Sequence, residues 1–228
     1  MKLILLGPQG AGKGTQAQRL ADEVGATHIS TGDIVRAEIK SGSELGKKVQ
    51  EYNDRGELVP DEIIVEMAKP YLVDADSWIL DGFPRNEAQA KALDQALQDI
   101  GEELDAVVAL EAPDDALVDR LSGRRQSQAT GKIYHVEYDP PPEDDSGPFV
   151  QRDDDAEKAI RRRLQIYHDQ TEPLKDYYAD RDLLITVDAE QEIPKVTRDI
   201  LGAVGREEDA LSSARASRSL RRCVRAGG

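Results

Sequence analysis

The sequence predicts an α/β fold in which a parallel sheet has helices on both faces. Short apolar runs alternate with helix-length segments along most of the 228 residues, and this alternation is typical of βαβ units. A chain of this length can bury a sizeable core. Because 39% of the residues are hydrophobic and only 4% are aromatic, we expect that core to be mainly aliphatic.

Five apolar runs are the expected strands, and longer segments between them are the expected core helices. The strands are Lys2–Leu6, Thr27–Ser30, Trp78–Leu80, Ala106–Leu110 and Leu183–Val187. The helices are Lys13–Val24, Asp61–Leu72, Asn86–Ile100, Asp114–Leu121 and Ala156–Tyr178, the last of them broken near Pro173.

Two segments interrupt the alternation and are expected to be inserts. Residues 30–59 carry two helical patterns, Thr31–Ser41 and Glu44–Arg55, without a strand. Residues 123–155 contain three consecutive prolines and a strand-like piece at Lys132–Tyr138. Inserts of this size are usually functional or disordered.

The last residues, 205–228, differ from the rest of the chain. They hold six arginines and three acids, and no apolar face is sustained, so we expect a disordered basic tail. A basic interaction arm is the alternative. The core is then expected to comprise residues 1–29, 60–122 and 156–204.

Charge and cysteine content exclude several classes of protein. The net charge of −15 is the opposite of the basic footprint of a nucleic-acid-binding protein. No apolar run approaches the roughly 18 residues that span a bilayer, and the first residues lead straight into a glycine-rich loop, leaving no room for a signal peptide. The single cysteine, Cys223, excludes a disulfide framework. We expect a cytoplasmic protein without nucleic-acid or membrane partners.

The first motif is the loop at residues 7–15, Gly-Pro-Gln-Gly-Ala-Gly-Lys-Gly-Thr, which follows an expected strand and opens an expected helix. Such glycines let backbone amides surround phosphate oxygens, and the helix N-terminus adds its dipole. Lys13 would reach the β and γ phosphates. The common form of this loop has Ser or Thr directly after the lysine, but here Gly14 separates Lys13 from Thr15. The sequence therefore does not decide whether the Thr15 hydroxyl binds Mg²⁺ directly. A glycine-rich turn without a ligand is the alternative.

The second motif runs from Trp78 to Arg85 and joins an apolar strand to a Gly-Phe-Pro turn. Nucleotide-binding sheets place a carboxylate near the metal at the end of such a strand, so we expect Asp81 to act on Mg²⁺ through water. A turn or helix cap is the alternative for an isolated aspartate, but Arg85 four residues later favours a site.

With these motifs and three others in the same order, the chain resembles the adenylate kinase family from Met1 to about Gly202. The matching segments are Gly7–Thr15, Ser30–Asp33 with Arg36, Asp81–Arg85 with Gln89, Val118–Arg125, and Gln151–Asp154 followed by Arg161–Leu164.

The resemblance implies a P-loop NTPase-type core, a nucleotide-monophosphate (NMP) insert at residues 30–59 and a lid at residues 123–155. It implies a monomer that transfers a phosphoryl group reversibly from Mg-ATP to AMP, giving two ADP, with lid closure over the nucleotides. The catalytic cations would be Lys13, Arg85, Arg120, Arg124, Arg152 and Arg163.

The nucleotide contacts carried over from the family fall into two groups. ATP would be held by Gly10, Ala11, Gly12, Lys13, Gly14, Thr15, Arg120, Arg124, Ile133, Tyr134 and the backbone of Gln191. AMP would be held by Thr31, Arg36, Glu57, Leu58, Val59, Gly82, Phe83, Pro84, Arg85, Gln89, Arg152 and Arg163.

The residue types fit this chemistry independently of the family. An acceptor that is itself an ionised phosphate needs no general base, and forked guanidinium groups suit phosphate oxygens better than ammonium groups do. We therefore expect His28 to be packed in its strand. Surface ion pairs are the alternative for Arg125, Arg161 and Arg162.

The lid departs from the zinc-binding relatives, which carry Cys-x-x-Cys pairs there, because this sequence has no cysteine in that insert. We expect no structural zinc. Ser127, Thr130, Asp145 and Ser146 fall near the corresponding positions and could form a hydrogen-bonded substitute. A polar turn without a network is equally compatible with the sequence.

Three other functions remain open: a UMP/CMP kinase, a GTP:AMP phosphotransferase, and a nucleotide-dependent switch or assembly factor. Thr31 and Gln89 favour adenine in the acceptor site, and the full-length lid favours ATP as donor. The arginine set argues against a pure switch, which needs no clamp on a second phosphate.

The acidic composition predicts a halophilic response to salt. The tail's net charge of +3 leaves −18 on residues 1–204 of a chain whose total is −15, and the chain has 11 lysines against 19 arginines. Repulsion among like charges destabilises the folded state, and salt screens it, since the Debye length falls from about 10 Å at 0.1 M to about 3 Å at 1 M. The melting temperature should rise steadily up to molar KCl, with activity retained and nucleotide affinity reduced.

Thermal unfolding across a KCl series measures this response. A flat or falling melting temperature would identify an ordinary acidic enzyme and contradict the halophilic interpretation.

Overall fold

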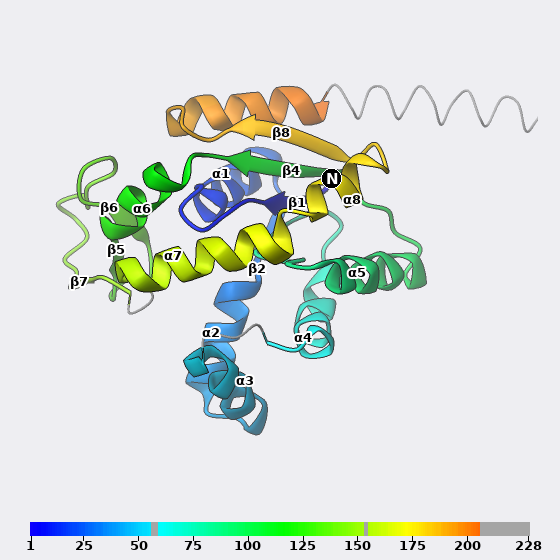
Figure 1. The fold of residues 1–228 in the computed structure, drawn as a ribbon, viewed down its shortest axis with the longest axis horizontal. Coiled ribbons are helices and arrows are strands. Elements are labelled where there is room, and N and C mark those ends of the chain that lie inside the picture. The colour runs from blue at the N-terminus through cyan, green and yellow to red at the C-terminus, as the bar shows by residue number, and fades with distance from the viewer. Residues whose placement is uncertain (56–58, 153–154, 206–228) are drawn as a thin grey trace, which may run out of the picture.

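A five-stranded parallel sheet with the order β2-β3-β1-β4-β8 forms the centre of the molecule. The computed structural model describes residues 1–55, 59–152 and 155–205 (Figure 1). The strands of the sheet are β1 (Lys2–Leu6), β2 (Thr27–Ser30), β3 (Trp78–Asp81), β4 (Ala106–Glu111) and β8 (Leu184–Asp188). The predicted α/β class is confirmed, with strand ends displaced by one residue in β3, β4 and β8.

Helices cover both faces of the sheet because successive strand residues point to opposite sides. Leu3 and Leu5 of β1 belong to one apolar cluster, whereas Ile4 and Leu6 belong to the other. The first cluster is completed by α1 (Lys13–Val24), α6 (Asp114–Ser122), α7 (Glu157–Ile166) and helical residues 193–205. The second is completed by α4 (Asp61–Val73), α5 (Glu87–Asp99) and α8 (Leu174–Ala179).

The helix at residues 193–205 is missing from the expected elements. Its buried residues Val196, Ile200 and Val204 recur every four positions, which is the helical spacing that could have revealed it. Its contact with α1 includes a hydrogen bond of 2.7 Å from the Thr197 hydroxyl to Gln16 Oε1.

The predicted break near Pro173 is confirmed, and the helix before it ends in a wider, π-helical turn. After α7 comes the π-helical segment η2 (Tyr167–Thr171), in which the Glu172 amide donates to the Tyr167 carbonyl at 2.9 Å. Helix α8 then begins after Pro173. The segment α7-η2-α8 runs across the molecule beside the sheet (Figure 1).

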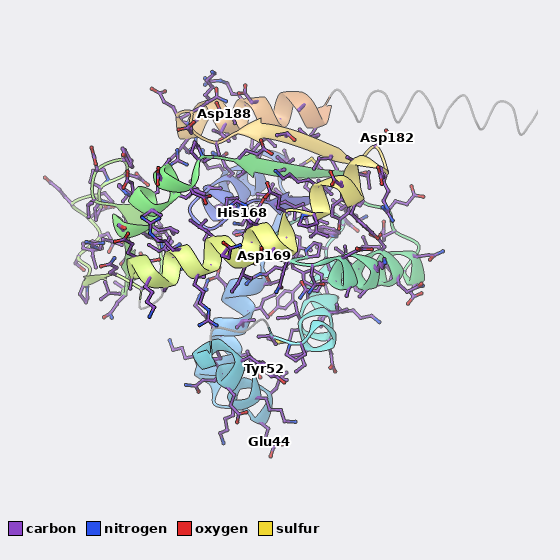
Figure 2. The ribbon with its side chains drawn as sticks, viewed as in Figure 1. Glu44, Tyr52, His168, Asp169, Asp182 and Asp188 are labelled. Atoms are coloured by element: carbon purple, nitrogen blue, oxygen red, sulfur yellow. The ribbon has the colours of Figure 1, made fainter. Side chains whose placement is uncertain are left out.

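The two helical patterns of the first insert are confirmed as α2 (Thr31–Ser41) and α3 (Glu44–Arg55). Ser30 is the N-cap of α2, and its hydroxyl accepts from the Asp33 amide at 3.3 Å. Both helices extend away from the sheet, and Figure 2 shows Glu44 and Tyr52 on the outlying helix α3.

The second insert contains a small antiparallel sheet with the order β6-β5-β7. Its strands are β5 (Arg124–Ser127), β6 (Ile133–His135) and β7 (Phe149–Val150). The expected strand Lys132–Tyr138 is therefore too long. The chain turns after His135 because the amides of Glu137 and Tyr138 donate to His135 Nδ1 at 3.1 and 3.0 Å.

A network centred on Asp145 holds this insert together. Its carboxylate accepts from Ser127 Oγ at 2.8 Å, Thr130 Oγ1 at 2.9 Å, Tyr134 Oη at 3.0 Å and the Gly147 amide at 3.1 Å. Burial raises the pKa of Asp145, but these bonds outweigh that effect and hold the pKa at about 2. Of the two alternatives that the sequence left open, the structure has the hydrogen-bonded network, and it includes Ser127, Thr130 and Asp145. Its other two donors are the Tyr134 hydroxyl and the Gly147 amide, whereas Ser146 is not among these partners of Asp145.

Gly123, the residue after α6, is required by the space available at this position. It ends α6 with an ordinary φ of −84°, and a Cβ there would lie 2.2 Å from His135 Nε2. The residue thus lets the His135 ring of the second insert pack directly on the end of α6.

Three segments of the chain lie outside the described residues, and with them the expected tail, Glu57 and Leu58. In the described part, none of the helices combines the length and apolar character that crossing a membrane requires.

Candidate active site

The predicted site lies at the carboxyl edge of the sheet, where the strand order reverses around β1. Strand β1 pairs with β3 on one side and β4 on the other, and ligands of open α/β sheets bind at such a switch point. The glycine loop leaves β1 there, and Asp81 at the end of β3 pairs in register with Leu5. Loop and carboxylate are therefore neighbours.

The glycine loop presents the open end of a helix. Gly12 is the N-cap of α1 with a left-handed backbone at φ 89°, and no side chain caps the helix. A residue with a Cβ would be strained at this φ. The first amides of α1 therefore remain available to an anion, as a phosphate-binding loop requires.

Lys13 lies at the centre of the charged groups. Its Nζ donates to the carbonyls of Gly7 at 2.8 Å and Pro8 at 2.9 Å. Burial lowers the pKa of Lys13 to about 8; the charge of Asp81 opposes this effect, and the charges of Arg85, Arg163 and Arg124 add to it. The structure thus brings together five of the charged residues expected from the sequence.

Asp81 fits the expected role beside a magnesium ion. A Cβ on Gly14 would lie 3.4 Å from Asp81 Oδ2, so the carboxylate faces the start of α1, where Thr15 is exposed. Magnesium is usually held by one or two carboxylates together with the phosphates of the substrate. His28, which we expected to be packed in its strand, has its Nε2 3.8 Å from Asp81 Oδ2.

Arg85 is fixed at three points. Its Nε donates to the Gly82 carbonyl at 2.7 Å, its amide donates to Gln89 Oε1 at 2.7 Å, and its carbonyl accepts from Thr171 Oγ1 at 2.7 Å. Gln89 is 2% exposed. Burial and the nearby charge of Arg163 lower the pKa of Arg85.

The remaining residues predicted to hold the acceptor nucleotide divide into a buried group and a more exposed group. Thr31 is buried, and its hydroxyl donates to the Asp81 carbonyl at 3.2 Å, next to Gly82. Phe83 and Pro84 are buried in the same turn. Arg36 is exposed and pairs with Asp33 at 2.5 Å, and Val59 is partly buried against the core.

Arg124 forms an ion pair that its position in the sequence does not predict. Two of its three guanidinium nitrogens contact Asp155, with Nε donating to Oδ2 at 2.9 Å and Nη2 to Oδ1. Asp155 is only 1% exposed. It is the last of three consecutive aspartates before α7, and nothing in that run distinguishes it from its neighbours.

Three other predicted lid and donor residues have partners elsewhere in the structure. Arg120 Nη2 donates to the Ala189 carbonyl at 2.9 Å, and Arg152 Nε donates to Gln126 Oε1 at 3.0 Å. Gln191 Nε2 donates to the Asp188 carbonyl at 3.0 Å and to Asp199 Oδ2 at 3.1 Å.

Ile133 and Tyr134 occupy different environments in β6. Ile133 is 39% exposed, whereas Tyr134 is buried and lies edge-on to Phe149. The Tyr134 hydroxyl donates its hydrogen bond to Asp145, so a contact with adenine would have to come from the backbone or the ring of Tyr134.

Surface ion pairs are the alternative role for Arg125, Arg161 and Arg162, and two of these three arginines have defined partners. Arg161 forms an exposed ion pair with Glu157 at 2.9 Å, which confirms that alternative. Arg125 Nη1 instead donates to the carbonyls of Ser122 and Arg124 at 3.2 and 2.7 Å.

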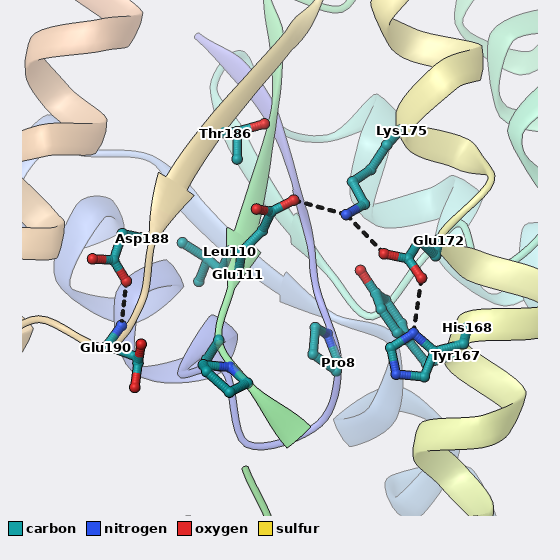
Figure 3. A pocket seen from close by; sticks show the side chains of 12 residues that line it. Pro8, Leu110, Glu111, Tyr167, His168, Glu172, Lys175, Thr186, Asp188 and Glu190 are labelled. Atoms are coloured by element: carbon teal, nitrogen blue, oxygen red, sulfur yellow. Dashed lines mark hydrogen bonds and ion pairs between the residues drawn. The ribbon is translucent and has the colours of Figure 1, made fainter. Parts of the chain in front are cut away.

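A pocket of about 490 Å³ opens beside the glycine loop, between the ends of β4 and β8 and the segment η2-α8 (Figure 3). One wall is a chain of polar contacts in which Glu111 pairs with Lys175 at 2.7 Å, Lys175 with Glu172 at 2.9 Å, and Glu172 with His168 at 2.8 Å. Carboxylates of Glu111, Glu172, Asp188 and Glu190 line it, so it does not suit a phosphate.

Comparison with known proteins identifies related sequences along almost the whole chain. A family model described as adenylate kinase matches residues 5–183. The adenylate kinase of Caldicellulosiruptor saccharolyticus is 46% identical over 215 residues, covering 91% of this chain and 100% of that protein. Those of Desulforamulus reducens and Methanocella arvoryzae are 48% and 45% identical over 212 residues each, covering 90% of this chain and 100% and 98% of those proteins.

The lowered pKa of Lys13 predicts pH-dependent ATP affinity. The free protein loses the Lys13 charge as the pH rises through about 8, whereas bound phosphates favour the protonated amine. The dissociation constant for Mg-ATP should therefore increase above that pH. Isothermal titration from about pH 6.5 to 9.5 would measure it.

Lys13→Met should bind weakly and lose this dependence. The matched control Lys91→Met removes an exposed lysine, 63% accessible, and should behave as the wild type. An affinity that stays constant across the range in the wild type would contradict the assignment.

Proposed function

Because the chain belongs to the adenylate kinase family, we propose that the group around Lys13, Asp81 and Arg85 carries out reversible phosphoryl transfer from ATP to AMP. The protein is a nucleoside monophosphate kinase, and the reaction yields two ADP. The observation that carries the residue assignment is the convergence of the glycine loop, Asp81 and Arg85 at the switch point of the sheet.

The donor half of the proposed site is the loop Gly10–Thr15. The uncapped amides of α1 and the Lys13 ammonium would hold the β and γ phosphates of ATP. Lys13 already contacts carbonyls of its own loop, so phosphate oxygens would replace partners of the same kind.

The acceptor half is the turn from Gly82 to Arg85 with Thr31 and Gln89. The Nε of Arg85 is bound to the chain, but a guanidinium has five N–H donors, and both Nη atoms can still grip a phosphate. We assign Arg36 and Glu57–Val59 to the same half because they match the family motif.

In-line transfer needs stabilisation of charge on the equatorial oxygens rather than a base. The cations that surround Lys13 supply that charge. Burial lowers the pKa of Lys13, and the charges of Arg85, Arg163 and Arg124 lower it further; burial and Arg163 act in the same way on the pKa of Arg85. The fold therefore holds these cations close together despite their repulsion. Bound phosphates relieve this repulsion, and most strongly where charge accumulates during transfer.

Mg²⁺ would lie between Asp81 and the phosphates, held by the carboxylate through water. Bound there, it would neutralise charge on the β and γ phosphates. The exposed hydroxyl of Thr15 is a second candidate oxygen on the same side.

The lid, residues 123–155, would close over both nucleotides. We assign Arg120, Arg124, Ile133, Tyr134 and Gln191 to the donor, and Arg152 with Arg163 to the bridge between the two phosphates. Closure would exclude water and so favour transfer over hydrolysis. A monomeric state, a cytoplasmic location and tolerance of molar salt are proposed from the sequence alone.

A coupled assay of ADP formation with Mg-ATP and each of the four common monophosphates tests the acceptor. AMP should react far faster than the others. Preference for UMP or CMP would indicate a pyrimidine kinase, a requirement for GTP would change the donor, and nucleotide binding without turnover would indicate a switch.

Arg85→Lys should lower activity at least tenfold while leaving ATP affinity nearly unchanged. The substitution keeps the charge but loses the fork that orients the acceptor phosphate, and orientation can contribute several kcal/mol. Steady-state kinetics with AMP and titration with Mg-ATP measure the two effects.

Arg161→Lys is the matched control, because Arg161 pairs with Glu157 on the surface, and it should change neither quantity. An equal loss of ATP affinity in Arg85→Lys would mean that Arg85 belongs to the donor half.

Lid closure predicts selective protection from hydrogen exchange. A bisubstrate analogue should protect amides between Gly123 and Asp155 far more than those of the central strands, which are already buried. Exchange measured by mass spectrometry with and without the analogue gives the comparison. Protection spread evenly over the chain, or absent from the lid, would argue against closure.

A further inference from the structure

The π-helical segment η2 reaches the proposed acceptor turn through one side chain. Thr171, the last residue of η2, is 9% exposed, and its hydroxyl donates to the Arg85 carbonyl at 2.7 Å. The two residues are 86 positions apart in the chain, so this contact joins separate parts of the fold.

The bond completes a clamp on the peptide that carries the Arg85 guanidinium. Gln89 Oε1 accepts from the amide of Arg85, and Thr171 donates to its carbonyl. Neither bond uses the guanidinium, so both persist when the side chain grips a ligand. The two bonds restrict the position of the Arg85 backbone, from which the side chain extends. An oriented contact with a ligand requires this restriction.

The same segment carries the second arginine of the bridge. Arg163 lies on α7, which continues directly into η2, so Arg163 and Thr171 belong to one continuous helical unit. The charges of Arg85 and Arg163 act on each other, and repulsion favours their separation. The Thr171 bond ties the Arg85 backbone to the unit that bears Arg163.

From this geometry we propose that Thr171 is a positioning residue for phosphoryl transfer, which sets Arg85 relative to Arg163 so that both guanidiniums meet the acceptor phosphate. The proposal rests on the assignment of Arg85 to AMP above. It predicts an effect on AMP rather than on ATP, because Thr171 contacts the acceptor turn.

Thr171→Val tests the bond, since valine has nearly the same shape without the hydroxyl. The kcat/KM for AMP should fall roughly three- to tenfold, the range expected for one neutral hydrogen bond, with the dissociation constant for Mg-ATP unchanged. Thr171→Ser should restore the wild-type value. Thr171→Ala removes the same donor without a branched side chain, and should repeat the loss if valine disturbs folding.

Thr197→Val is the matched control for stability. Thr197 is also a buried threonine, 7% exposed, and its hydroxyl donates to Gln16 Oε1 at 2.7 Å. This variant should lower the melting temperature without changing the kinetic constants for AMP.

Combining Thr171→Val with Arg85→Lys separates the possible failures. If Thr171 acts through Arg85, the two losses should be less than additive. Three results would overturn the role of Thr171 alone: an unchanged kcat/KM for AMP in Thr171→Val, equal losses of kcat/KM for AMP and of affinity for Mg-ATP, or a kcat/KM that Thr171→Ser does not restore.

If Arg85→Lys weakens the binding of Mg-ATP and leaves kcat/KM for AMP unchanged, the assignment of Arg85 to AMP is wrong, and the proposed role of Thr171 is wrong with it.

Discussion

The structure depends on holding like charges together at one edge of the sheet before a ligand arrives. The charges of Arg85, Arg124 and Arg163 all act on Lys13, and that of Arg163 also acts on Arg85. Two of them are held by neutral groups, since Lys13 donates to two loop carbonyls and Arg85 to that of Gly82. A carbonyl satisfies a donor without cancelling its charge, so the positive potential needed by phosphate is retained.

Arg124 is held differently, by the buried carboxylate of Asp155. This pair lies at the junction of the lid with the core, between β5 and the start of α7. A buried ion pair is costly to break on one side only, so it fixes the base of the lid. The lid itself has few apolar residues to bury, and the four donors around Asp145 provide the order that a hydrophobic core would otherwise give.

The core strands and most helices could be predicted from the sequence because their signals are local. The apolar runs, the glycine loop and the strand that ends at Asp81 are each contained within a short stretch of the chain. The Arg124–Asp155 pair and the Thr171–Arg85 bond could not be predicted from residue spacing, since each joins positions far apart in the chain. The π turn is also hidden, because the buried residues Ile160, Leu164, Tyr167 and Thr171 keep the period of an ordinary α-helix.

The polar contacts of η2 and α8 explain how one segment, α7-η2-α8 (the arm), can be attached both to the core beside the glycine loop and to the proposed acceptor turn. His168 contacts Asp114 of α6 at 3.1 Å, and Lys175 contacts Glu111 of β4 at 2.7 Å, so the arm is tied to the core beside the glycine loop. On its other side Thr171 ties it to the acceptor turn. Arg163 also lies on the arm, so its position is fixed relative to both proposed nucleotide sites. A cation that must bridge two phosphates has to be fixed relative to both, because an error of about 1 Å in placement can cost roughly a hundredfold in rate.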